Sequence, residues 1–110
     1  MCELYAEDYA DVWRRSWHRA RRDRRCGVCW RTIRQGEHYE VTFVVSDGSA
    51  DSCSSCAQCA GTIQLFGEAH NFWPFPESFV EYLRECVRDL DGARWMPFLE
   101  LIEARIRGHA

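Results

Sequence analysis

Apolar residues near the start of the chain recur at intervals of three and four, the spacing that gathers side chains on one stripe of a helix. The stripe consists of Tyr5, Tyr9, Val12, Trp13, Trp17 and Ala20. Arginines fill the last turns of the segment, where cations suit the negative end of a helix dipole. The pattern therefore predicts an N-terminal helix over about residues 3–24, ended by Cys26 and Gly27.

Alternation of apolar and polar residues over residues 37–45 predicts the clearest β-strand of the chain. One face would carry Tyr39, Val41, Phe43 and Val45, and the opposite face would carry His38, Glu40 and Thr42. The dipeptide of Asp47 and Gly48 that follows is typical of a tight hairpin turn. We expect residues 49–55 to return as the second strand, although their composition favours a strand only weakly.

Helical spacing returns after the hairpin and predicts three more helices. A short helix is expected over residues 56–66 with Gly67 as its cap, a second over residues 77–90, and a third over about residues 97–107. The inward stripes of the last two would be Phe79, Leu83, Val87 and Leu90, then Phe98, Leu101, Ile102 and Ile106. The aromatic loop of residues 68–76 is expected to close the core.

The length of the chain, 110 residues of which 46% are hydrophobic, suits one domain with a packed core. We expect residues 1–110 to form this domain, with a central module over about residues 25–66 and a C-terminal helical part over about residues 76–108. No apolar run is long enough to span a membrane, and no signal pattern begins the chain. These features predict a cytoplasmic α+β protein.

Seven cysteines are many for such a protein, and an odd number argues against a disulfide framework. Four of them form two Cys-x-x-Cys pairs, Cys26 with Cys29 and Cys56 with Cys59, on either side of the predicted hairpin. Each such turn lets two thiolates converge on one ion, and two turns complete the tetrahedral sulfur shell that zinc accepts. The spacing predicts one structural zinc ion in a treble-clef-like module of hairpin and short helix.

The second pair of ligands can be chosen in two ways. Cys56 and Cys59 fit best, because one would end the returning strand and the other would lie in the first helical turn. Cys53 with Cys56 repeats the same spacing and stays open, as do unligated buried cysteines. The run lacks the further cysteine of an iron–sulfur motif. Arg25 and Arg31, beside the first pair, would offset the negative charge of the thiolates.

Catalytic chemistry has little support in the sequence. A catalytic zinc ion needs an open coordination position, which four cysteines close. We find no nucleophile–base pair, no phosphate-binding loop and no paired acids at an informative spacing. His38 and His70 are expected at the surface or in packing contacts. We therefore expect neither an enzyme nor a small-molecule substrate.

A longer set of residues accompanies the paired cysteines. It comprises Arg24, Arg25, Thr32, Ile33, Gly36, Glu37, Tyr39, Asp47, Gly48, Ala57, Gln58, Ala60, Phe72 and Trp73. With this set, the stretch from Arg14 to about Glu81 resembles small zinc-finger proteins encoded by phages and prophages. The resemblance implies a single zinc site at the two Cys-x-x-Cys pairs. Cys53, the long N-terminal helix and the last helix depart from the pattern.

The charges are unevenly distributed, because residues 14–34 hold nine arginines against one acid and the remainder holds five arginines against sixteen acids. The candidate residues for binding a partner protein or nucleic acid are Arg14, Arg15, Arg19, Arg21, Arg22, Arg24 and Arg25. They would neutralise phosphates while the interleaved Trp13, Trp17 and Trp30 stack on bases. The alternative is that these arginines pair with acids elsewhere in the chain.

An acidic row at near-helical spacing offers a second candidate surface, against the alternative of an ordinary solvated helix face. It consists of Glu77, Glu81, Glu85 and Asp89. Such a row would imitate nucleic acid toward a basic groove of a host protein. By analogy of size and context with inhibitors of host defence, including anti-CRISPR proteins, the favoured function is non-enzymatic binding of a host protein in the host cytosol. Nucleic-acid binding is the alternative, and the oligomeric state stays open.

Overall fold

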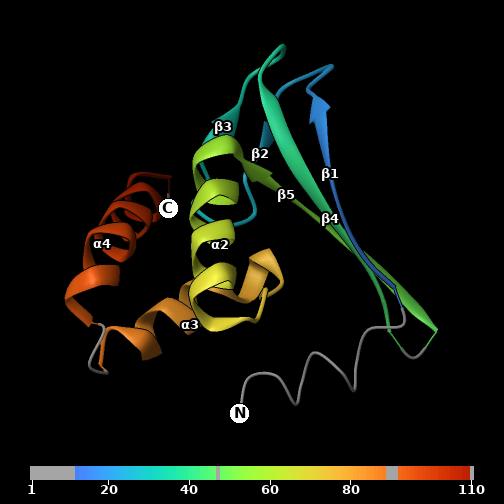
Figure 1. Ribbon diagram of the computed structural model, residues 1–110. Helices are drawn as coiled ribbons and strands as arrows, with labels where there is room; N and C mark the ends of the chain where they lie inside the picture. Colours follow the sequence, from blue (N-terminus) through green and yellow to red (C-terminus); the bar gives the residue numbers. More distant parts are fainter. Residues whose placement is uncertain (1–11, 47, 89–91, 110) are drawn as a thin grey trace.

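The computed structural model describes residues 12–46, 48–88 and 92–109, which form an α+β fold (Figure 1). Its elements in chain order are β1 (Val12–Arg19), β2 (Arg24–Arg25), β3 (Thr32–Ile33), β4 (His38–Ser46), β5 (Ser49–Cys56), α2 (Ala57–His70), the 3-10 turn η1 (Pro76–Ser78), α3 (Phe79–Cys86) and α4 (Gly92–His109). Among the described residues, no helix is both long and apolar enough to cross a membrane.

The strands form a three-stranded antiparallel sheet in the order β1-β4-β5 and a small second sheet of β2 and β3. The central strand β4 is the one that alternation predicted, and its hairpin partner β5 follows as expected. The register pairs Ser46 with Ser49, so two residues connect the strands. One of them, Gly48, has a φ of 79°, a left-handed conformation that glycine adopts without strain.

The N-terminal helix predicted over residues 3–24 is wrong in the part that the structure describes. Val12–Arg19 is strand β1, which pairs with β4 along its whole length. Valine and tryptophan suit a pleated surface, and the ladder with β4 supplies hydrogen bonds that outweigh the helical spacing of Trp13 and Trp17. Residues 3–11 of the predicted helix lie outside the described residues.

Burial of the two faces of the sheet differs from what the alternation predicted. Glu40 and Thr42, on the expected polar face, are buried, whereas Val41 on the apolar face is only half-buried. Helix α2 lies beside β4 and β5 and covers the face that carries Glu40 (Figure 1). Arg15 of β1 reaches both elements, with Nη2 2.9 Å from a Glu40 oxygen and Nη1 donating to Gln64 of α2. The buried carboxylate is therefore paired.

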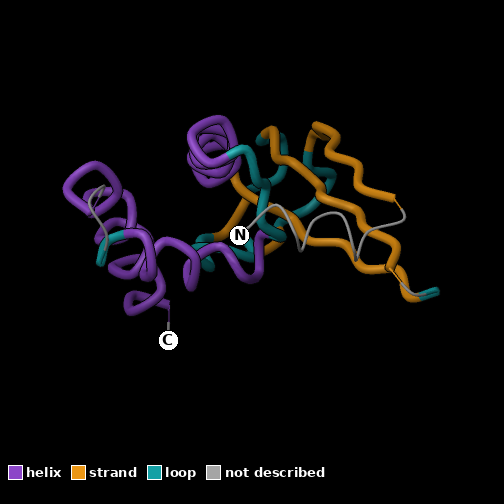
Figure 2. The backbone as a smooth tube through the Cα atoms, turned by 60° about the horizontal axis from the view of Figure 1, so that its bottom comes forward, coloured by secondary structure: helices purple, strands orange, loops and turns teal. Residues whose placement is uncertain are grey.

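Aromatic rings join the three helices, which Figure 2 shows grouped to one side of the strands. The ring centroid of Phe66 in α2 lies 5.4 Å from that of Phe79 in α3 and 5.3 Å from that of Trp95 in α4. Leu83 of α3 is fully buried in the same cluster. Phe72 of the predicted aromatic loop is buried as well, so this loop closes the core as expected.

Two helices extend beyond their predicted bounds. Helix α2 continues past Gly67 and ends at His70, and Asn71 caps it in a left-handed conformation with a φ of 54°. Gly67 is instead buried within the helix, where the Trp73 indole occupies the space of a side chain. Helix α4 begins at Gly92, earlier than predicted, and Leu101 of its expected inward stripe is 39% exposed.

Candidate metal centre

Four cysteines from separate parts of the chain converge on one buried point. Cys26 and Cys29 occupy the turn between β2 and β3, Cys56 ends β5, and Cys59 lies in the first turn of α2. The Sγ atoms all lie within 4.8 Å of one another, and none of the four residues is more than 1% exposed. The structure thus brings together the four cysteines that the paired spacing favoured.

Backbone hydrogen bonds shape the first turn. The Cys26 N–H donates to the Arg31 carbonyl over 2.9 Å, and the Trp30 N–H donates to the Cys26 carbonyl over 3.1 Å. Trp30 has a φ of 69°, so the chain reverses through a left-handed residue just after Cys29. The Val28 N–H points at the Cys26 sulfur, 3.4 Å away. This closed turn directs both thiols to the same side.

The second pair is positioned by the end of the hairpin and the start of α2. The Gly27 N–H donates to the Ser54 carbonyl over 2.7 Å, which fixes the first turn beside β5. Cys56 follows two residues later, and its N–H donates to the Cys26 sulfur over 3.3 Å. Cys59 then lies at the positive end of the α2 dipole. The N–H donated to the Cys26 sulfur and the helix dipole at Cys59 each favour a negative charge on the sulfur atom concerned.

The sulfur positions fit one tetrahedral metal ion. Metal–sulfur bonds of about 2.3 Å at tetrahedral angles place the sulfurs about 3.8 Å apart. The Cys29 and Cys56 sulfurs are 3.9 Å apart. Every cysteine that the structure describes is a free thiol rather than half of a disulfide. A closed all-sulfur shell suits a structural ion, because no coordination position is left for a substrate.

Proton sharing among the four cysteines also indicates that the cluster holds a metal ion. Hydrogen bonding with Cys26 lowers the pKa of Cys29 to about 6 and also lowers the pKa of Cys56. The same hydrogen bonding raises the pKa of Cys26, chiefly through Cys29, and of Cys59, chiefly through Cys26. Four adjacent thiolates repel one another, so a cation is required for all four to be ionised together.

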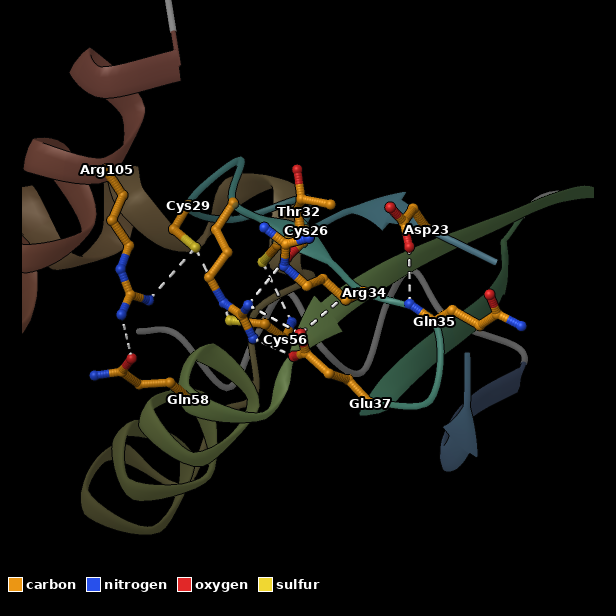
Figure 3. Close-up of polar contacts among 11 residues, drawn as sticks. Asp23, Cys26, Cys29, Thr32, Arg34, Gln35, Glu37, Cys56, Gln58 and Arg105 are labelled. Atoms are coloured by element: carbon orange, nitrogen blue, oxygen red, sulfur yellow. Dashed lines mark hydrogen bonds and ion pairs between the residues drawn. The ribbon is translucent and has the colours of Figure 1, made fainter. Parts of the chain in front are cut away.

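Two arginines supply positive charge beside the cluster, and one of them, Arg105, is labelled in Figure 3. Arg105 of α4 lies with Nη1 3.8 Å from the Cys29 sulfur and is anchored by Gln58 of α2. Arg31 forms an ion pair with Glu37 at 2.6 Å, and its pKa is raised first by this carboxylate and then by Cys56. The expected role of Arg31 thus has structural support. Arg105 was missed, because 76 residues separate it from Cys29 and no local pattern connects them.

The remaining cysteines and histidines lie outside this group. Cys53 is buried against Gly27, and burial, together with the charge of Glu77, raises its pKa to about 11. The alternative ligand set with Cys53 is therefore not the one that the structure assembles. His38 is exposed on β4, and His70 at the end of α2 contacts the carbonyl of Phe66.

The arginines predicted as a binding surface divide into two groups. Arg15 is occupied by Glu40, and the Arg24 guanidinium lies over the ring of Tyr39, 4.7 Å from its centroid. The others are exposed and form no ion pair with a described residue. They are Arg14, Arg19, Arg21, Arg22 and Arg25.

The predicted acidic row is carried by η1 and α3. Glu77, Glu81 and Glu85 are exposed and form no ion pair with a described residue. Asp89 of this row, and Leu90 of the apolar stripe, lie outside the described residues.

Comparison of the chain with protein-family models, with curated proteins and with solved structures finds no match. The interpretation of its function therefore depends on its own geometry.

Proposed function

We propose that the protein binds nucleic acid through an arginine-rich end that is held in shape by one structural zinc ion. Zinc is the ion that a closed shell of four buried cysteines suits best, and the order of turn, hairpin and helix N-terminus around it supports a treble-clef-like module. The ion joins the β2–β3 turn to the end of β5 and the start of α2. It would therefore hold the arginine-bearing segments against the rest of the fold.

The observation that carries the proposal is a group of exposed arginines, here called the arginine end. It consists of Arg19, Arg21, Arg22, Arg25 and Arg34. Two backbone hydrogen bonds of 2.9 Å join the segments that bear them. The Ala20 N–H donates to the Glu37 carbonyl, and the Gly36 N–H donates to the Ala20 carbonyl. The carboxylate of Asp23 accepts from the Gln35 N–H over 2.8 Å. These contacts hold the loop after β1 beside the turn before β4.

Little negative charge opposes this group. Residues 12–46 hold nine arginines and three acids. Glu37 and Glu40 are paired with Arg31 and Arg15, and Asp23 already accepts a backbone hydrogen bond. The exposed guanidinium groups are thus uncompensated by the described part of the chain. A row of phosphates supplies the missing charge, and arginine binds phosphate oxygens with its planar fork of donors.

The shape of the surface suits the same ligand. An open hollow of about 560 Å³ is lined by His18, Arg19, Ala20, Arg21, Gln35 and Gly36. Two guanidinium groups and an amide side chain at the wall of one hollow offer donors to an anion from several directions.

The test is a salt series with two charge-matched variants. Arg21→Glu with Arg22→Glu removes two cations from the arginine end, whereas Arg88→Glu with Arg107→Glu makes the same change at exposed positions after α3 and in α4. We expect the first variant to weaken binding strongly and to reduce the slope of log K against log salt by about 1.4, the loss of two phosphate contacts on a single strand. Equal weakening in both variants, or no binding by the parent protein at low salt, would refute the proposal.

A second candidate function is binding of a basic host protein through the acidic row. The exposed and unpaired Glu77, Glu81 and Glu85 favour it. This surface lies on η1 and α3, apart from the arginine-bearing segments in the chain. Substituting these three glutamates by glutamine should abolish capture of such a partner while leaving binding of nucleic acid intact or stronger. Capture that survives the triple substitution would exclude this surface.

A further inference from the structure

Trp17 is an exposed indole that the fold does not use. It lies on β1 and is 55% exposed, more than any other large apolar side chain that the structure describes. Trp13 on the same strand is also exposed, but its ring meets that of Phe75 edge to face, with centroids 6.5 Å apart. Trp17 has no ring contact with a described residue. Packing therefore accounts for the indole at Trp13 but not for the indole at Trp17.

The position of Trp17 connects it to the arginine end. Strand β1 is an edge strand, and side chains two residues apart share one face, so Trp17 and Arg19 project to the same side about 7 Å apart along the strand. Arg19 in turn lines the hollow with Arg21. An exposed apolar ring thus lies on the same face of β1 as an arginine that lines the hollow.

This combination of an aromatic ring and cations discriminates between forms of nucleic acid. In a duplex the bases already stack on one another, so an indole at the surface gains nothing from them. A single strand exposes the faces of its bases, and stacking of one base on an aromatic side chain stabilises the complex in any sequence context. The phosphates that follow that base along the strand would meet Arg19 and Arg21.

We infer that the ligand of the arginine end is single-stranded nucleic acid, with one base stacked on the Trp17 indole and the adjoining phosphates on Arg19 and Arg21. The inference rests on the proposed nucleic-acid function and names the strand state that it requires. It assigns base contact to Trp17 and backbone contact to the arginines. Binding should therefore tolerate changes of sequence and should favour a single strand over a duplex.

The experiment measures anisotropy of a labelled oligothymidylate and of a labelled mixed-sequence duplex of equal length with the full, metal-loaded chain. We expect the parent protein to bind the single strand more tightly. Trp17→Ala should weaken single-strand binding roughly tenfold without changing the salt slope, and Trp17→Phe should retain most of the affinity. Met96→Ala, which truncates a 40% exposed apolar side chain of α4, is the matched control and should change nothing.

The outcomes separate this inference from the proposed function. Equal affinity for duplex and single strand, with no effect of Trp17→Ala, would overturn the role of Trp17, while the arginine variants would still weaken binding. Binding of neither probe at low salt would overturn both. Because Trp17 is largely exposed, thermal melting of Trp17→Ala should match that of the parent, so a loss of affinity cannot come from unfolding.

Discussion

Removing one cysteine of the cluster should unfold the protein, whereas removing a neighbouring buried cysteine should not. The two substitutions are Cys59→Ser, within the cluster, and Cys53→Ser, outside it. Both residues are buried, at 1% and 8% exposure, so the control reproduces the change of a buried thiol to a hydroxyl. The Cys53 sulfur donates a long hydrogen bond, 3.8 Å, to the carbonyl of Ser54. The comparison would therefore isolate the contribution of an ion bound by the cluster.

The expected difference is large. A structural zinc ion contributes about 10–16 kcal/mol of apparent binding free energy in zinc-finger peptides. The total free energy of unfolding of a domain of this size is about 5–15 kcal/mol. Losing even about 5 kcal/mol with one ligand lowers Tm by about 20 °C, since about 1 kcal/mol shifts Tm by about 4 °C in a domain of this size. Cys53→Ser should cost about 1–2 kcal/mol.

The assay is thermal melting by circular dichroism, combined with measurement of bound metal by atomic emission. We expect one zinc ion per chain in the parent and in Cys53→Ser, and both a lost ion and a collapsed melting transition in Cys59→Ser. A Cys59→Ser variant that melts like the parent without metal would refute the structural role of the ion. Equal destabilisation by both substitutions would show that burial alone, and not metal binding, sets the effect.

Acid should act in the same direction as ligand removal. The Cys29 pKa, lowered from its ordinary value of 9.0 to about 6 by Cys26, means that this thiolate contributes stability in full above about pH 9. That contribution is lost as the pH falls through about 6. Protons also compete with the ion for every sulfur, so acidification below about pH 6 should release metal. Metal retained at pH 4, followed with a chromogenic chelator, would contradict thiolate ligation.

Three further substitutions test the packing around the site. Gly67→Ala should lower stability by about 1–3 kcal/mol in urea titration, because the new Cβ would lie 2.1 Å from the Trp73 indole; an unchanged midpoint would contradict this packing. Trp30→Gly should hold or raise Tm, since relief of its left-handed φ of 69° is worth about 1 kcal/mol, and a large drop would mean that the indole stabilises the fold. Glu40→Ala should lower the free energy of unfolding by about 3 kcal/mol, because it leaves the Arg15 guanidinium half-buried without its carboxylate. If Glu40→Ala destabilises the protein less than Glu40→Gln does, the result would argue against the ion pair of Arg15 and Glu40.

The metal centre could be predicted from the sequence because its information is local. Two Cys-x-x-Cys pairs each specify a turn, and the Asp47-Gly48 dipeptide between them specifies the hairpin that brings the pairs together. The order of turn, hairpin and helix could be expected before any contact was known. To choose between Cys53 and Cys59 as a ligand, one has to know where the helix begins. Strand β5 ends at Cys56 and α2 follows directly, so Cys59 lies in the first helical turn.

The sequence alone thus identified two Cys-x-x-Cys turns and the hairpin between them, since backbone geometry within a few residues settles each, but it left Cys53 open as an alternative ligand to Cys59. Only the tertiary structure decided that Val12–Arg19 is a strand, because its hydrogen-bond partners lie on β4. It also decided which arginines are occupied: Arg15 meets Glu40 across the sheet, and Arg105 returns to the metal centre from the last helix. Such pairings depend on register between distant segments, which periodicity within one segment does not encode.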